Sequence, residues 1–168
     1  MKAHVRKNDE VIIIAGDDKG KKGRVTVDDA VITMGKFKNG AIACLEASRF
    51  AAGRKNHIQL EINGSKGSLV FDFEDMNRLK YFNREDAPDR QGYRDIIVTE
   101  GVHPYAGAWW PPGHIIGYEH TFVHTVRDFI AAVAKGRPVQ PTFADGLQNQ
   151  KVLEAVEKSS KSRRWVKV

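Results

Sequence analysis

Apolar and polar residues alternate along two neighbouring segments in the middle of the chain. Flanking the glycine-containing stretch 64–67, the apolar positions are Ile58, Leu60, Ile62, Leu69, Phe71 and Phe73. A period of two places alternate side chains on the same face of a strand. The pattern therefore predicts two strands that bury one face of a sheet.

Three other regions also have strand character. Two apolar stretches between residues 30 and 50 are joined by Lys38-Asn39-Gly40, and Asn-Gly favours the positive φ angles of a two-residue hairpin turn. Near the N-terminus, the apolar run 11–15 precedes a Gly-Asp-Asp turn and a Lys/Gly cluster, which predicts a strand, a tight turn and a second strand. Residues 95–100 predict another strand, and the alternation at 163–168 favours a short closing one.

Helical spacing begins only in the last third of the chain. Between Tyr118 and Lys135, apolar residues recur every three or four positions, and the pattern stops before Gly136. A second helix is expected from an N-cap at Asp145 to about Ser160. The stretch 101–117 has neither period and is rich in Pro, Gly, His and aromatic residues, so we expect an ordered loop there.

Strands followed by two helices are typical of the α+β class. The expected fold is an open, mostly antiparallel sheet with helices packed on one face, preceded by a short β-hairpin-like leader. The other face of such a sheet is solvated or, if it is apolar, pairs with another subunit. A homo-oligomer formed through this open face is therefore expected.

Length and charge narrow the class further. The 168 residues suffice for one domain with a small appendage. The longest apolar run is far too short to span a membrane, which leads us to expect a cytoplasmic protein without membrane contact. The net charge of +6 is concentrated at the two ends, with +3 in residues 1–25 and +4 in residues 151–168. The single Cys44 lies among apolar neighbours and is expected to be a small buried residue.

Most of the chain resembles a known oxidoreductase domain. From about Val25 onward, "VDDAVITMGKFKNGAIACLEASRFAAGRKNHIQLEINGSKGSLVFDFEDMNRL", "HPYAGAWWPPGHIIGYEHTFVHTVRDFIAAVAKGRPVQPTFADGL" and "RWVKV" are similar to the C-terminal domain of the Gfo/Idh/MocA family. This family comprises NAD(P)-dependent oxidoreductases that act on sugars, inositols and related polyols. The resemblance implies a substrate-side domain.

The first 25 residues resemble a different family. "VRKNDEVIIIAGDDKGKKGRV" is similar to the RNA-binding KOW motif of a large-subunit ribosomal protein, but the strands of a whole KOW barrel do not follow it. We therefore expect two parts: a basic KOW-like leader over residues 1–25 and the oxidoreductase-like domain over residues 26–168. The apparent fusion point lies near "KGRVTV".

The motifs that would make such a domain a complete enzyme do not occur in the sequence. No G-x-G-x-x-G turn for a dinucleotide is present, and the family's Glu-Lys-Pro lysine and Asp/His pair lie upstream of the matched region. We therefore assign no catalytic or cofactor-binding residue, and NAD(P) is implied only for a full-length relative. Enzymatic activity is uncertain, and the expected function is that of a truncated substrate-binding and oligomerisation domain, inactive alone.

Two alternatives remain open. The chain could be a ribosome-associated protein that contacts ribosomal RNA weakly through the cationic residues of its leader, which are Lys19, Lys21, Lys22 and Arg24. The competing interpretation of those residues, which we favour, is a solvated basic hairpin or a frayed end. The chain could also complement a separate Rossmann subunit.

A sugar or polyol ring needs flat apolar faces beside hydrogen-bonding groups. The loop residues that could supply them are Trp109, Trp110, His114, Tyr118 and His120. The resemblance implies that Arg49 is a further substrate-binding residue, which could hold a hydroxyl or carboxylate. The competing interpretation is that the tryptophans cover a sheet edge and Arg49 pairs with Glu46 or Glu61.

A metal site near the first helix is a weaker hypothesis. His120 and His124 are four residues apart, so they could bind a metal with His114 or Glu119 as a third ligand. No His-Glu-x-x-His pattern is present, and structural histidines are commoner, so no metal site is predicted.

Overall fold

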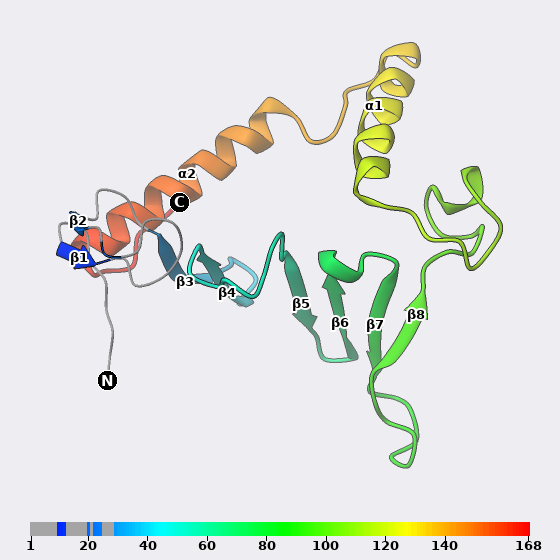
Figure 1. Cartoon of the computed structure of the whole chain (residues 1–168), viewed down its shortest axis with the longest axis horizontal. Coiled ribbons are helices and arrows are strands. Elements are labelled where there is room, and N and C mark those ends of the chain that lie inside the picture. Colours follow the sequence, from blue (N-terminus) through cyan, green and yellow to red (C-terminus); the bar gives the residue numbers. More distant parts are fainter. Residues whose placement is uncertain (1–9, 13–19, 21, 25–28) are drawn as a thin grey trace. The chain divides into compact units, whose positions relative to one another are not determined.

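The computed structural model describes residues 10–12, 20, 22–24 and 29–168 (Figure 1). The chain divides into two compact units, Met1–Arg54 and Lys55–Val168. Every strand pair in the described part of the chain is antiparallel, and both long helices follow the last strand. The predicted α+β class is confirmed. The expected boundary between residues 25 and 26 stays a prediction.

The described part of the first unit contains two separate pairs of strands. β1 (Glu10–Ile12) pairs with β2 (Lys22–Arg24), as expected from the sequence of the leader. β3 (Ala30–Lys36) pairs with β4 (Ile42–Ser48) along their whole length. The predicted hairpin is therefore present.

The turn of the β3–β4 hairpin differs from the prediction. Its loop has three residues, because the amide of Phe37 donates to the carbonyl of Ala41 (2.8 Å) and the amide of Gly40 donates to the carbonyl of Phe37 (3.0 Å). Gly40 has a φ of 90°, whereas Asn39 is not among the described residues with positive φ. One glycine in the left-handed region is enough for a three-residue loop, so the predicted two-residue turn is wrong.

The second unit is built on a four-stranded sheet, drawn as adjacent green arrows in Figure 1. Its strands, in spatial order, are β5 (Gln59–Asn63), β6 (Gly67–Asp72), β7 (Arg78–Asn83) and β8 (Arg94–Ile97). A 3₁₀ turn, η1 (Phe73–Asp75), follows β6. Leu60 lies opposite Phe71, and Ile62 opposite Leu69, so the alternating apolar residues share one face as predicted.

Two helices complete the second unit. α1 (Tyr118–Ala134) closely matches the predicted helix and is followed by Gly136 with a φ of 58°. α2 (Phe143–Ser162) begins earlier than predicted, because Thr142 is the N-cap and Asp145 lies three residues inside. The carboxylate of Asp145 accepts from the amide of Thr142 (2.7 Å), and this bond lowers the pKa of Asp145.

The C-terminal residues differ from expectation. Arg163 ends α2 in the left-handed region (φ 55°), and its amide donates to the carbonyl of Ser159 at 2.7 Å. Residues 164–168 then follow an irregular path, so the closing strand suggested by their alternation does not form. Alternation alone was insufficient because a strand also needs a neighbour with which to pair.

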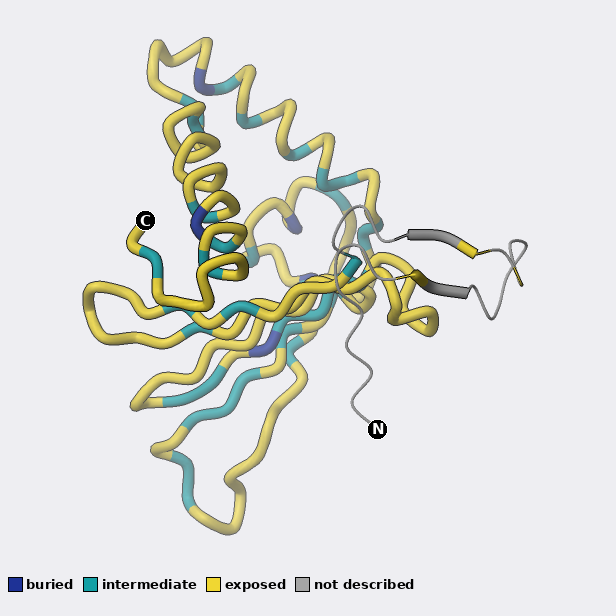
Figure 2. The backbone as a smooth tube through the Cα atoms, turned by 90° about the vertical axis from the view of Figure 1, so that its left-hand side faces the viewer, coloured by how far each residue is buried: buried dark blue, intermediate teal, exposed yellow. Residues whose placement is uncertain are grey.

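Few of the described residues are fully buried, as the mostly yellow and teal tube of Figure 2 shows. The apolar residues that are buried in the described part are Val70, Ala106, Ala132 and Ala155. Leu60 and Ile62 remain 56% and 53% exposed, so the prediction that this sheet face is buried is wrong for the chain alone. Cys44, expected to be buried, is also exposed, because it lies on a hairpin whose side chains are largely uncovered.

Candidate functional site

The loop between β8 and α1 is ordered by two polar side chains from the sheet. Asn77, just before β7, accepts a hydrogen bond from the amide of Ile116 (3.0 Å) and donates to the carbonyl of the same residue (2.8 Å). Thr99, which is buried, accepts from the amide of Gly113 (3.1 Å). A short turn, η2 (Ala106–Ala108), lies within the loop. The predicted ordered loop is confirmed.

A cluster of aromatic and histidine rings joins this loop to the start of α1. The indole nitrogen of Trp109 donates to Nε2 of His124 at 2.7 Å. The ring of Tyr105 stacks on His124 with centroids 4.3 Å apart, and Trp109 meets His120 edge to face at 4.4 Å. Because Nε2 of His124 accepts a hydrogen bond, the neutral imidazole carries its proton on Nδ1.

Tyr105 is held in this cluster by a second polar contact. Its hydroxyl donates to Asp128, whose other carboxylate oxygen accepts from Arg127 at 2.7 Å. The hydrogen bond from Tyr105, followed by that from Arg127, lowers the pKa of Asp128, and the same contact raises the pKa of Tyr105. Tyr105 has a φ of 65°, a costly conformation for a bulky residue, which the surrounding contacts maintain.

The sequence analysis did not single out Tyr105 or Asp128. The spacing of His120, His124 and Asp128 at four-residue intervals was the available signal, because it places all three on one face of a helix. Nothing in the sequence indicated that Tyr105 would reach Asp128 across 23 positions.

His120 and Tyr118 are engaged in packing at the start of α1. Nδ1 of His120 accepts from the amide of Gly117 at 3.1 Å and so satisfies a free amide at the helix N-terminus. The ring of Tyr118 contacts Phe73 (5.9 Å between centroids) and Phe122 (5.1 Å) edge to face. Gly117, the N-cap, has no side chain to contribute, so His120 provides this cap alone.

An open depression beside the cluster contains two of the predicted residues. Its volume is about 490 Å³, and it is lined by Trp110, Gly113, His114 and Ile115. Trp110 is 55% exposed, and Nδ1 of His114 lies 2.9 Å from the carbonyl of Pro111. If Nδ1 donates to this carbonyl, Nε2 of His114 is left as an acceptor for a ligand hydroxyl.

The candidate residues therefore fall into three groups. Trp110 and His114 line the depression, whereas Trp109, Tyr118 and His120 support the neighbouring loop and helix through ring contacts. Arg49 belongs to the first unit, directly after β4, and its amide donates to the carbonyl of Asp29 (2.8 Å). Within the described residues it has no ion pair with Glu46 or Glu61, the partners considered in the competing interpretation.

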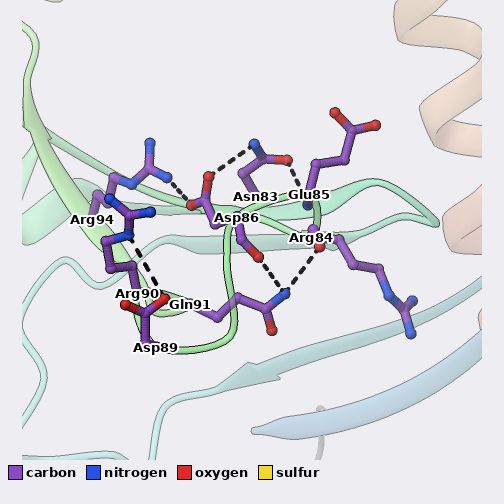
Figure 3. Close-up of polar contacts among 8 residues, drawn as sticks. All are labelled: Asn83, Arg84, Glu85, Asp86, Asp89, Arg90, Gln91 and Arg94. Carbon is purple, nitrogen blue, oxygen red and sulfur yellow. Dashed lines mark hydrogen bonds and ion pairs between the residues drawn. The ribbon is translucent and has the colours of Figure 1, made fainter.

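The loop between β7 and β8 is a second polar cluster, but its groups bind one another (Figure 3). Asp86 accepts from Asn83 (3.2 Å) and pairs with Arg94. Gln91 donates to the carbonyls of Arg84 (3.0 Å) and Asp86 (2.9 Å). These contacts order the loop, and the arrangement is that of a structural cluster.

The possible metal ligands near α1 already have other partners. Nδ1 of His120 and Nε2 of His124 accept from Gly117 and Trp109, as described above. The group of potential ligands that does converge in the described part of the chain consists of His57, Asp72 and Glu74. It lies at η1, and the sequence analysis did not consider it.

Of the four residues proposed for RNA contact, Lys22 and Arg24 form part of β2, and Lys22 is exposed. Lys19 and Lys21 lie outside the described residues. No helix in the described part of the chain is long and apolar enough to cross a membrane.

Comparison with known proteins identifies the larger part of the chain. Residues 3–168 match the model of the oxidoreductase family C-terminal alpha/beta domain, GFO_IDH_MocA_C. A levoglucosan dehydrogenase from Pseudarthrobacter phenanthrenivorans is 43% identical over 150 residues, which are 89% of this chain and 38% of the relative. The chain thus spans about two fifths of the length of this relative.

Solved structures agree with this match. An oxidoreductase domain protein from Kribbella flavida is 56% identical with a TM-score of 0.82, over 88% of this chain and 40% of that one. A levoglucosan dehydrogenase in complex with NADH and L-sorbose is 42% identical, also with a TM-score of 0.82, over 89% of this chain and 39% of that one.

A shorter similarity concerns a different family. The large ribosomal subunit protein uL24 of Vibrio atlanticus is 64% identical over 36 residues, which are 21% of this chain and 31% of the relative. This match is consistent with the KOW-like segment identified in the sequence.

Proposed function

The chain belongs to the Gfo/Idh/MocA oxidoreductase family through its C-terminal domain, and on that premise we propose that it supplies the substrate-side wall of a sugar or polyol dehydrogenase and has no turnover alone. The observation that carries the proposal is the 42% identity to a dehydrogenase solved with NADH and L-sorbose, over only 39% of that chain. Hydride transfer needs a seat for the nicotinamide cofactor, and these 168 residues contain no G-x-G-x-x-G turn.

The depression next to the aromatic cluster suits a sugar ring. Trp110 offers an exposed apolar face, and His114 offers a ring nitrogen for a hydroxyl. Behind them, Trp109, His120 and Tyr118 maintain the shape of the loop and of the first turn of α1. We assign direct contact with the ligand to Trp110 and His114 and a supporting role to the other three. For Arg49, which belongs to the first unit, a role in substrate binding stays a prediction from the sequence.

Self-association through the uncovered sheet face is the second part of the proposal. Leu60 and Ile62 present more than half of their surface to solvent on the face that also carries Leu69 and Phe71. Removing apolar surface of this kind from water favours association. A second copy of the chain offers the same face, as a symmetric dimer requires.

Two measurements test the enzymatic part. The purified chain should show no NAD(P)H oxidation with a panel of sugar and polyol substrates, and clear turnover would overturn the proposal. Saturation-transfer NMR should detect sugar or polyol binding by the chain. Trp110→Ala should reduce this signal, whereas Trp165→Ala, at an exposed tryptophan outside the depression, should leave it unchanged.

The similarity to uL24 favours an alternative function for the leader, in which β1–β2 contacts ribosomal RNA through Lys22, Arg24 and the neighbouring Lys19 and Lys21. Such contact would be weak and salt-sensitive, because it depends on phosphate charge. Co-sedimentation with large ribosomal subunits at low salt tests it, and the absence of any sedimentation there would exclude it.

A chain that completes its active site with a separate Rossmann subunit is a further alternative, favoured by the same partial coverage of the relatives. Dehydrogenase activity that appears only when a cofactor-binding subunit is added would support it. An unchanged absence of activity in the mixture would count against it.

A further inference from the structure

Three potential metal ligands meet where β6 ends. His57 precedes β5, Asp72 is the last residue of β6, and Glu74 lies in η1. Each of the three offers one ligand atom, and these atoms all lie within 4.8 Å of one another. Nδ1 of His57 is 3.5 Å from Oδ1 of Asp72 and 3.5 Å from Oε2 of Glu74.

These separations are long for a hydrogen bond and short for unrelated groups. A charged N–H···O bond between imidazolium and carboxylate is normally about 2.7–2.9 Å long. Ligand atoms bound tetrahedrally at about 2.1 Å from a zinc ion lie roughly 3.4 Å from one another. The two distances of 3.5 Å therefore fit the edges of a metal coordination polyhedron better than they fit hydrogen bonds.

The surroundings of the imidazole nitrogen favour a role as a metal ligand. Nδ1 of His57 is buried and has no hydrogen-bond partner. A buried polar atom without a partner costs free energy, and native structures contain few such atoms. A metal ion bound to its lone pair would remove this cost.

The backbone orients both carboxylates. Oδ1 of Asp72 accepts from the amide of Glu74 (2.9 Å), and Oε1 of Glu74 accepts from the amide of Lys55 (3.2 Å). Oε2 of Glu74 is the oxygen that lies 3.5 Å from Nδ1 of His57. The amide of Phe73 also donates to the carbonyl of Ile58 (2.9 Å), so the two chain segments that carry the ligands are joined. Ligands oriented by such outer contacts bind metals more tightly.

We propose that His57, Asp72 and Glu74 bind one divalent transition-metal ion, with Zn²⁺ as the best-suited species, and that the ion ties the segment entering β5 to the end of β6. One imidazole and two carboxylates form a donor set that zinc accepts, with water completing the coordination. The site lies on the sheet rather than in the depression beside α1, so its role is structural.

The test uses the full chain, freed of metal with a chelator and then dialysed against Zn²⁺. We expect one bound ion per chain and a rise in the thermal midpoint of roughly 5–10 °C at zinc concentrations about 100-fold above Kd. His57→Gln and Asp72→Asn should abolish both effects. His103→Gln removes another of the six histidines and should retain them.

Asp72→Asn keeps an oxygen that can accept from the amide of Glu74, so this variant remains informative if His57→Gln fails to fold. Substituting Co²⁺ should give the intense visible absorption of a four-coordinate ion in the wild-type chain, and this absorption should be missing in both variants. The proposal is overturned if the wild-type chain binds no stoichiometric ion, or if His57→Gln binds as much as the wild type. If the wild-type chain binds no stoichiometric ion and His57→Gln is destabilised equally in chelator and in zinc, the three side chains form a simple ion pair.

Discussion

The loop leading into α1 and the β3–β4 hairpin both contain many apolar residues but are stabilised in different ways. The loop is fixed by side chains from distant parts of the chain, as in the paired bonds between Asn77 and Ile116. In the hairpin, the described contacts are mainly backbone bonds between the two adjacent strands, and Ile32 and Ile42 remain 72% and 71% exposed.

This difference distinguishes the two parts of the proposed function, which are substrate binding and self-association. The polar geometry around Trp109 and His124 is complete within the second unit, so the candidate substrate wall does not need another chain to take its shape. The apolar surface of the hairpin does need a cover, because exposed groups of this size favour association. The following predictions test that contrast, beginning with the largest expected effect.

Replacing Asn77 with alanine should damage the loop most. The change removes two hydrogen bonds and leaves the amide and carbonyl of Ile116 without partners, which should lower the free energy of unfolding by about 2–4 kcal/mol. Urea denaturation measures this loss. Asn39→Ala is the matched control, because Asn39 makes a short-range bond to the amide of Ala41 (3.1 Å) in the exposed hairpin turn. Equal effects at the two sites would break the comparison.

Trp109→Phe should have a smaller effect, because it keeps a ring but removes the donor to His124. We expect a loss of about 1 kcal/mol in the free energy of unfolding. ¹⁵N NMR of the imidazole should at the same time show that His124 no longer holds its proton predominantly on Nδ1. A tautomer distribution unchanged by the substitution would contradict the described hydrogen bond.

The contact between Tyr105 and Asp128 predicts a pH dependence. Because the pKa of Asp128 is lowered from its ordinary value of 3.8 in the folded chain, its contribution to stability is present above about that pH. The contribution is lost as the pH falls through the lower, folded-state pKa. The thermal midpoint of the wild type should exceed that of Asp128→Asn by a constant margin from neutral pH to about pH 4, and the margin should narrow below. If the margin instead widens on acidification, the pKa of Asp128 is not lowered on folding, and the contact between Tyr105 and Asp128 is excluded.

Ile32→Lys should change the stability of the single chain least, within about 0.5 kcal/mol, because the side chain is already exposed. If the exposed apolar surface of the hairpin takes part in the proposed self-association, Ile32→Lys should weaken association, as measured by sedimentation. Val102→Lys places the same charge on an exposed apolar position of the loop, and we expect no effect on association. Equal effects of the two substitutions would show that charge, not the hairpin surface, controls association.

Much of the local structure followed from the order of the residues. The period-two pattern around residues 64–67 predicted the β5–β6 pair, and the three- and four-residue spacing after Tyr118 predicted α1. Both signals are local, because they depend on which side chains share a face within a few residues. Helix ends were predicted less accurately: Asp145 was expected to be the N-cap of α2, but the N-cap is Thr142.

The candidate site was predictable only in part. The composition of the loop 101–117 pointed to Trp110 and His114 as candidate site residues. It could not show that these two line the depression while Trp109 and His120 make supporting ring contacts, because that depends on the direction in which each ring points. Adjacent residues such as Trp109 and Trp110 are indistinguishable in a sequence without periodicity.

By itself, the sequence determined the α+β class, the family and the positions of most helices and strands, because these depend on local spacing and on extended similarity. The tertiary structure decided which groups meet across long separations, such as Tyr105 with Asp128 and His57 with Asp72. It also decided that a face with the pattern of a core remains open in this chain. The physical reason is that periodicity specifies which side chains share a face, while burial depends on what packs against that face.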